Sequence, residues 1–331
     1  MKKMRFNLLI FTLLLGGLFI SGCEQKTETK VIRLGHGLDI THPVHKAMVF
    51  MAEQVDEKSD GSLQIKVYPS QQLGTERELI ELLQIGSLGI TKVSAAVLEN
   101  FTPKARVFSL PYLFRDDAHM YNVLDGEIGR ELLLEPQHAW LRGLTYYDAG
   151  KRSFYTKDRP IETPEDLEGL KIRVLESQMA ISMVNELGGS PTPISWGELY
   201  SALQQGIVDA AENNPPSFHT SRHYEVCKYY SLDEHTAIPD VLLIGTNVWN
   251  DLTENQKKWL QEAADTSAIY QRKLWHEAEE TALREVEAAG VEINRPDKEP
   301  FRELTEPIYN RIQQESPEIY EVVERIREVE S

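Results

Sequence analysis

Short apolar runs alternate with longer amphipathic runs along two parts of this chain, the first in the amino-terminal third and the second at about 159–215. In the second part, the runs at 170–174, 190–194 and 207–211 have the length of strands, and helix-length segments separate them. Strands that alternate with helices form parallel sheets, because two parallel neighbours need a crossover connection between them. This part therefore predicts an α/β domain.

The amino-terminal part has the same order of elements. Strands are predicted at 31–35, 63–68 and 88–93, and helices at 43–58 and 76–84. The chain has 331 residues, whereas a single hydrophobic core stops growing near roughly 250 to 300 residues. Two α/β domains are therefore expected.

Cap and turn residues mark the ends of several predicted helices. Ser195 followed by Glu198 is a capping-box pattern, and Gly188 and Gly206 stand where the end of a helix favours glycine. Thr163 precedes a proline and two acids, which predicts the start of a helix.

Polar residues follow the predicted strands of both domains. Ligands of open parallel sheets bind beyond the carboxyl ends of the strands. In the second domain, the residues at these ends are Arg173, Ser195, Trp196, Asn213 and Asn214. In the first domain, they are His36, Gly37, Asp39, the turn 74–77 and Ser94. The sequence therefore predicts a ligand held between two domains.

The first residues have the parts of an export signal. Lys2, Lys3 and Arg5 precede the apolar run 8–20, which at about 1.5 Å per residue spans only roughly 20 Å and is short for a membrane span. Small residues then precede Cys23, a pattern similar to the lipobox of bacterial lipoproteins. The similarity implies cleavage before this cysteine, its lipidation and attachment to a membrane. The alternative is an ordinary cleaved signal with an incidental cysteine.

Charge and cysteine content narrow the classes of partner. The net charge is −17, and removal of residues 1–22 with their three basic residues would leave −20. We expect no binding to nucleic acid, and any anionic ligand must be recognised by local donors. Cys227 is the only cysteine besides Cys23. It is interpreted as a small core residue, with a reactive thiol as the alternative.

Several motifs, in the same order along the chain, resemble the extracytoplasmic solute-binding proteins of TRAP transporters, of the DctP type. The matching segments are 72–74 with Glu76 and Arg77, 108–116, 169–174, 198–204 and 208–213. The resemblance extends from about Lys30 to the C-terminus. Ala210 is a departure, because the family usually has glycine there.

The resemblance implies an α/β, periplasmic-binding-protein-like fold with two domains and the ligand in the cleft between them. Strands would cross between the domains, and a long helix would lie across both. A capping box at Thr253 and Gln256 begins a helical pattern that runs to Gly290, roughly 50 Å if unbroken. The expected division is a lipoprotein signal peptide at 1–22, a tether at 23–30, mainly domain I at 31–150, mainly domain II at 151–245, and a helical segment at 246–331 that spans both and returns to domain I.

The resemblance also implies roles for two arginines. Arg173 would pair with a ligand carboxylate, which its planar guanidinium can bind through two parallel hydrogen bonds. Arg152 would be the second arginine, with Lys151 as a competing choice. The alternative for both arginines is an ion pair with one of the many acids of the chain.

Further ligand contacts are implied in both domains. They are Asn213, Asn214, Trp196, Glu76, Ser94, His36 and Asp39. An amide both donates and accepts hydrogen bonds and so suits sugar hydroxyls, but an asparagine before two prolines also suits a turn. Trp196 would either stack on a sugar or pack at the start of a helix.

The segments 213–217, 221–226 and 233–242 resemble a subgroup that takes uronic acids such as glucuronate or galacturonate. Sialic acid and C4-dicarboxylates stay open as ligands. The expected protein is a monomer that delivers its ligand to the membrane subunits of a TRAP transporter. A membrane sensor is the alternative recipient.

Two other classes of function have weaker support. Glu76 and Glu212 could be nominated as the acid pair of a carbohydrate hydrolase, but the chain has no Gly-x-Ser-x-Gly motif and no feature that distinguishes this pair. The pairs His42 with His45 and His219 with His223 have metal-ligand spacings, although prolines nearby make the helices uncertain. We therefore expect no enzymatic activity, no cofactor and no metal.

Overall fold

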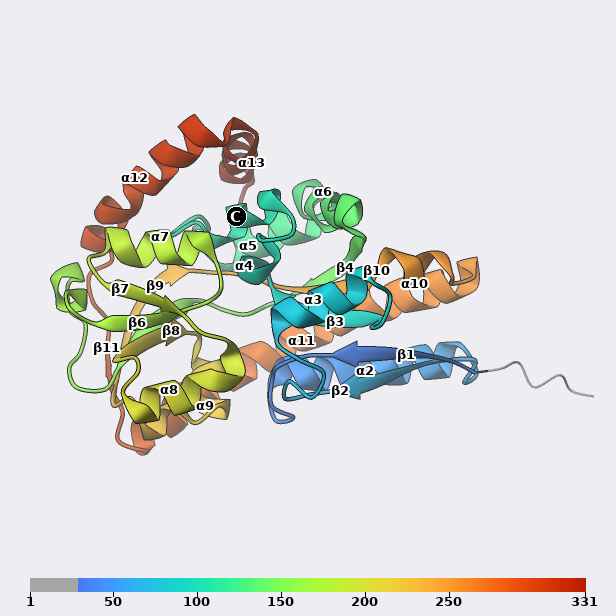
Figure 1. Ribbon diagram of the computed structural model, residues 1–331, viewed down its shortest axis with the longest axis horizontal. Coiled ribbons are helices and arrows are strands. Elements are labelled where there is room, and N and C mark those ends of the chain that lie inside the picture. Colours follow the sequence, from blue (N-terminus) through green and yellow to red (C-terminus); the bar gives the residue numbers. More distant parts are fainter. Residues whose placement is uncertain (1–28) are drawn as a thin grey trace, which may run out of the picture.

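The computed structural model describes residues 29–331, which form two lobes with one sheet each (Figure 1). The first sheet has the strand order β2 (Leu63–Tyr68), β1 (Lys30–Gly35), β3 (Ile90–Ser94), β10 (Asp240–Gly245) and β4 (Leu141–Tyr147). The second has the order β11 (Glu292–Asn294), β9 (Tyr229–Thr236), β5 (Arg152–Thr156), β8 (Ala210–Asn213), β6 (Lys171–Val174) and β7 (Ser190–Pro193). The predicted signal peptide and lipobox lie outside the described residues.

Helices cover both sheets. Those of the first lobe are α2 (Pro43–Lys58), α3 (Glu76–Gln84), α4 (Ala95–Leu98), α5 (Asp117–Asp125), α6 (Glu127–Leu134) and α10 (Thr246–Asn250). In the second lobe, α7 (Gln178–Glu186) lies on one side of the sheet, and α8 (Leu199–Gln205) and α9 (Pro215–Thr220) lie on the other (Figure 1). Short 3-10 helices are η1 (Pro103–Ser109), η2 (Glu135–Ala139), η3 (Pro164–Leu167), η4 (Trp196–Glu198) and η5 (His223–Glu225). Along residues 29–331, no helix combines the length and the apolar character that a membrane crossing requires.

The strands predicted from the alternation with helices are parallel, as expected, but each sheet also contains antiparallel strands. Strands β1, β2 and β3 are parallel, as are β6, β7 and β8, but β10 and β5 run antiparallel to their neighbours. Both antiparallel strands arrive from the other lobe. The chain crosses from β4 to β5 through 148–151, and from β9 to β10 through 237–239. An isolated apolar run does not reveal the lobe from which its chain comes, so the sequence pattern could not predict this reversal.

The predicted helix ends are partly confirmed. Gly188 and Gly206 adopt left-handed φ angles of 87° and 73°, as a glycine at a helix end does. The start at Thr163 leads only to the short η3. At Ser195, the hydroxyl donates to the Glu198 carboxylate (2.6 Å) instead of capping the backbone, so the predicted capping box is absent there.

The two lobes share part of their hydrophobic core. One buried cluster contains Val93 and Tyr146 of the first sheet together with Phe154 and Ile172 of the second. Ile238, in the crossing between β9 and β10, belongs to the same cluster. The lobes are therefore fixed to each other on this side by apolar packing as well as by the crossing strands.

The predicted long helix is present as α11 (Glu254–Ala288), one unbroken helix of 35 residues. The capping box at Thr253 and Gln256 begins it, as predicted. It contacts α2 in the first lobe and α9 in the second, and so lies across both (Figure 1). Beyond it, α12 (Glu299–Glu315) packs on α7 of the second lobe, and α13 (Pro317–Glu328) packs on α6 and η1 of the first.

The crossing at 148–151 is attached to α11. The Gln271 side chain donates to the Asp148 carbonyl and accepts from its amide, both at 2.8 Å. Two residues later, Gly150 has a left-handed φ of 56°. A Cβ at Gly150 would lie 2.9 Å from Trp275 Nε1 and 3.1 Å from Glu279 Oε1. Glycine here permits close contact between the crossing and the helix.

We predict that Gly150→Ala destabilises the protein more than Gly169→Ala. Both glycines have a left-handed φ, but a Cβ at Gly169 would meet nothing within 4 Å. The backbone cost, about 1 kcal/mol, is common to both variants, and overpacking adds about 1–3 kcal/mol at Gly150 only. Urea unfolding measures the difference. Equal losses of stability would show that the contact with α11 does not constrain the crossing.

Candidate ligand-binding site

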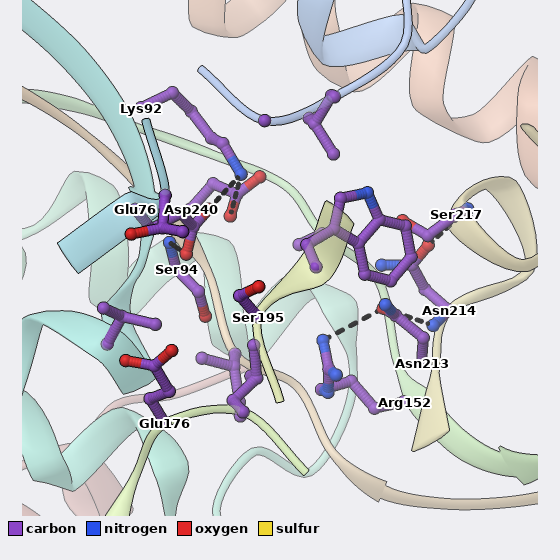
Figure 2. Close-up of a pocket in the computed structure, with 18 of the residues that line it drawn as sticks. Glu76, Lys92, Ser94, Arg152, Glu176, Ser195, Asn213, Asn214, Ser217 and Asp240 are labelled. Carbon is purple, nitrogen blue, oxygen red and sulfur yellow. Dashed lines mark hydrogen bonds and ion pairs between the residues drawn. The ribbon is translucent and has the colours of Figure 1, made fainter. Parts of the chain in front are cut away.

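A pocket lies between the lobes, and Figure 2 shows polar side chains that reach it from both sides. Of the nine predicted ligand-binding residues, seven line it: Glu76, Ser94, Arg152, Arg173, Trp196, Asn213 and Asn214. Polar and aromatic lining residues that the sequence analysis did not select for this role include His42, Gln71, Lys92, Glu176, Ser217, Asp240 and Trp275.

The ends of the strands place these side chains. Arg173 and Asn213 stand at the carboxyl ends of β6 and β8, and Ser94 stands at that of β3, which is the usual ligand edge of parallel strands. The antiparallel strands present their amino ends at the same edges. Arg152 begins β5, and Asp240 begins β10 directly opposite Ser94 in the register.

Arg173 is a buried cation, and few protein groups pair with its charge. Its side chain is only 1% exposed. The Nε donates to the Ile194 carbonyl (2.9 Å), while the buried Nη1 has no hydrogen-bond partner among residues 29–331. Burial lowers the pKa of Arg173, although the Glu212 carboxylate opposes this. A buried charge is costly unless it is paired, so this guanidinium favours an incoming anion.

Trp196 covers this arginine. The guanidinium carbon of Arg173 lies 5.7 Å from the centre of the Trp196 ring, within cation–π range. The ring also packs against His223, with 5.0 Å between centroids. Trp196 thus borders the pocket and restricts the position of the guanidinium.

Arg152 differs, because most of its donors are already used. Its Nε donates to the Glu212 carboxylate, its Nη2 to both the carboxylate and the carbonyl of Glu212 (2.9 Å each), and its Nη1 to Asn213 Oδ1 (3.0 Å). A guanidinium has five N–H donors, so one remains. The ion-pair alternative therefore describes Arg152 well. Lys151 lies outside the pocket lining and pairs with Asp117 at 3.2 Å.

Alternating charges support Arg152 from behind. His235 lies 3.5 Å from Glu212 through Nε2 and 2.7 Å from Asp233 through Nδ1. Burial by itself would lower the pKa of His235 and raise that of Glu212, but the neighbouring charges have the larger effect. Asp233 and Glu212 raise the pKa of His235 to about 9, and Arg152 with His235 lowers that of Glu212 to about 2. Glu212 is therefore occupied and absent from the pocket lining, which removes the supposed acid pair with Glu76.

The two asparagines have different roles. The Asn213 amide oxygen accepts from Arg152 and from the Asn214 backbone amide (2.9 Å), which orients its NH2 group as a donor. The Asn214 amide oxygen caps α9 by accepting from the Ser217 backbone amide (2.9 Å). The side-chain oxygen of Asn214 therefore has a structural role at the start of α9, and Asn214 also lines the pocket.

In the first lobe, a lysine lies between two acids. Lys92 Nζ is 3.0 Å from Glu76 Oε1 and 3.1 Å from Asp240 Oδ1. Glu76 Oε2 accepts from the backbone amide of Ser94 (3.1 Å), and Figure 2 shows these four residues together. Sequence reasoning missed Lys92 and Asp240. A lysine inside the apolar run 88–93 was the available signal, since a buried lysine must be paired.

His36 and Asp39 do not line the pocket, in contrast to the expectation. His36 is buried beneath the loop, 3.0 Å from His45, and its Nδ1 accepts from the Leu38 amide. Burial, with Lys92 nearby, lowers its pKa to about 2, so it stays neutral. The exposed Asp39 instead closes a turn by accepting from Thr41. The loop after β1 therefore turns these side chains away.

The other predicted histidines and the cysteine have structural partners. His42 lies 3.2 Å from the Ser217 hydroxyl across the cleft, and His223 lies 2.9 Å from the Tyr155 hydroxyl. The described part of the chain contains no group of three or more His, Cys, Asp or Glu residues arranged for a metal ion. Cys227 is fully buried, and burial raises the pKa of its thiol to about 12, which agrees with a core residue.

Comparison with known proteins identifies relatives over most of the chain. Residues 34–316 match the model of DctP, the bacterial extracellular solute-binding protein family 7. A solute-binding protein of Chromohalobacter salexigens is 38% identical over 292 residues, 88% of this chain and 87% of the relative.

Solved structures share the fold. A TRAP periplasmic solute-binding protein from Bradyrhizobium sp. BTAi1, in complex with α/β-D-galacturonate, is 40% identical with a TM-score of 0.88 and covers 91% of this chain and 100% of that chain. One from Roseobacter denitrificans with bound β-D-glucuronate is 37% identical, also with a TM-score of 0.88 and the same coverage.

The alternating charges of Glu212, His235 and Asp233 predict a pH dependence of the stability. Because the pKa of folded His235 is raised from 6.5 to about 9, its protonated form stabilises the fold below about pH 6.5, and this contribution is lost as the pH rises towards 9. Between pH 6.5 and 8.5, the free energy of unfolding in urea should fall by about 1–2 kcal/mol more in the wild type than in His235→Gln. His276→Gln, at an exposed position, should keep the wild-type slope. Identical slopes in all three proteins would contradict the assignment.

Proposed function

Since the chain belongs to the DctP family of bacterial extracellular solute-binding proteins, we propose that its solute is a uronic acid such as glucuronate or galacturonate. Its function is extracytoplasmic binding of a solute for a TRAP transporter, and not catalysis. The observation that carries the uronate proposal is the buried Arg173, whose Nη1 has no acceptor among the described residues.

A ligand carboxylate is the group that suits Arg173. Its planar shape matches the guanidinium and permits two parallel hydrogen bonds. Each hydrogen bond to a charged group contributes about 1.5–3 kcal/mol. The remaining N–H of Arg152 and the NH2 group of Asn213 are further donors on the same lobe. This side of the pocket therefore favours the acid group of the solute.

The rest of the pocket suits hydroxyl groups. Amides, carboxylates, an ammonium group and serine hydroxyls line it, from residues such as Asn214, Glu76, Lys92 and Ser94. A hydroxyl group both donates and accepts, and can pair with all of these. A carboxylate on a polyhydroxylated ring has this combination of groups. The uronates bound by the solved relatives at 37–40% identity support the same choice. Sialic acid remains the second candidate in a ligand screen.

The mature protein is proposed to be a monomer attached to a bacterial membrane through a lipidated Cys23. The support is the sequence pattern of basic residues, an apolar run and small residues before this cysteine. Residues 23–30 would act as a tether, with one domain formed mainly by 31–150, the other by 151–245, and 246–331 across both. The membrane subunits of the TRAP transporter are the proposed recipients of the ligand.

Arg173→Ala should weaken binding of galacturonate or glucuronate at least about 100-fold, because two charged hydrogen bonds are lost. Arg173→Lys retains the charge but loses the planar pair of donors, so it should remain badly impaired. Isothermal titration calorimetry measures both, with Arg284→Ala on α11 as the control. Because Arg173 is one of the largest fully buried side chains, the melting temperature of each ligand-free variant is compared with that of the wild type to separate loss of binding from loss of folding. Wild-type affinity in Arg173→Ala would refute this assignment.

Cys23→Ser should release the protein from membranes if the cysteine carries the acyl chains. In the native host, the wild-type protein should sediment with the membrane fraction and the variant should appear in the soluble extracytoplasmic fraction. Mass spectrometry of the mature N-terminus should show a lipidated cysteine in the wild type. A wild-type protein that is soluble and unmodified would favour the ordinary signal peptide instead.

A further inference from the structure

The first-lobe side of the pocket contains one buried cation between two acids. Lys92 is 3% exposed in the middle of β3, and it contacts Glu76 from α3 and Asp240 from β10. These three side chains, called here the acid–lysine cluster, have a formal charge of −1 when all are ionised. Burial and the nearby Glu76 carboxylate raise the pKa of Asp240, while the charge of Lys92 acts in the opposite direction.

We infer that the acid–lysine cluster binds hydroxyl groups and rejects a second carboxylate, so that the receptor selects monocarboxylate sugar acids over dicarboxylates of the same length. This inference rests on the proposed function, in which the single carboxylate of the ligand binds Arg173. It decides between two of the ligand classes that the sequence left open.

The hydrogen-bonding capacity of the cluster supports hydroxyl recognition. An ammonium group has three donors, and Lys92 uses two of them on Glu76 and Asp240. Glu76 Oε2 already accepts from the Ser94 amide, whereas Asp240 Oδ2 has no hydrogen-bond donor among residues 29–331. A sugar hydroxyl can accept from Lys92 and donate to Asp240 at the same time.

A carboxylate in the same place would be poorly matched. It has no hydrogen to donate, so it would face the carboxylates of Glu76 and Asp240 with only one free donor from Lys92. Two carboxylates at close range also repel it, and such like-charge contacts cost several kcal/mol in a buried site.

The two sides of the pocket therefore differ in the charge that they accept. Arg173 and the last N–H of Arg152 face it from the second lobe, and the acid–lysine cluster faces it from the first (Figure 2 shows Arg152 and the cluster on opposite sides). A ligand with one acid end and one hydroxyl end has a single favourable orientation. Arg77 of the first lobe also lines the pocket, but it is paired with Glu81 at 3.2 Å, so a second acid end meets no cation as free as Arg173.

The test compares galactonate with galactarate. Both are open-chain six-carbon acids with the same arrangement of hydroxyl groups on the four central carbons, and they differ by one terminal CH2OH or carboxylate. By calorimetry, the wild-type protein should bind galactarate about 100-fold more weakly than galactonate. Glu76→Gln keeps the shape and leaves Lys92 paired with Asp240. It should bind galactarate about 10-fold more tightly than the wild type does.

Glu53→Gln is the matched control, because it removes the same charge from the first lobe at an exposed position of α2 that is outside the pocket lining. It should leave the galactarate affinity unchanged within about a factor of three. An equal gain in both variants would attribute the effect to general charge and overturn the inference, as would no gain in Glu76→Gln. If the wild type binds no uronate and Arg173→Ala changes nothing, the proposed function fails instead.

Discussion

A buried positive charge with an incomplete set of protein partners is the constraint on which this binding site depends. Arg173 is almost fully buried, and its Nη1 has no hydrogen-bond partner within 29–331. The neighbouring charges are compensated: Arg152 pairs with Glu212, and His235 lies between Glu212 and Asp233. Because these groups satisfy one another, none of them can neutralise Arg173 without leaving another charge unpaired. In our proposal, the ligand supplies the missing anion.

The way in which the chain crosses between the lobes creates this arrangement. Each sheet receives one antiparallel strand from the other lobe, and the amino ends of these strands bring Arg152 and Asp240 to the edges where parallel strands present Arg173 and Ser94. The same crossings set the spacing of the lobes. Trp275 of α11 both lines the pocket and packs against Gly150 in the first crossing, so the helix links the position of the lobes to the shape of the site.

Much of this could be predicted from the sequence, because periodicity and cap residues are local signals. The long helix, most strands and the carboxyl-end position of Arg173 and Asn213 followed from them. The reversed strands β5 and β10 did not, since strand direction depends on distant partners. Glu212 could be nominated for an acid pair because its partner Arg152, 60 residues away, is invisible to a local pattern. His36 was misplaced for a similar reason, as the path of the loop after β1 determines where its side chain points.

The overall acidity of the chain and its proposed recognition of an anion are compatible because they act over different distances. Exposed charges are screened beyond about 8–10 Å at physiological salt, so the net charge of −17 affects the approach of an anion more than its binding. Inside the cleft, low polarity strengthens the field of the nearest groups. In our proposal, Arg173 attracts one carboxylate there, while Glu76 and Asp240 around Lys92 repel another. The local placement of charge, and not its sum, therefore determines which acid is held and in which orientation.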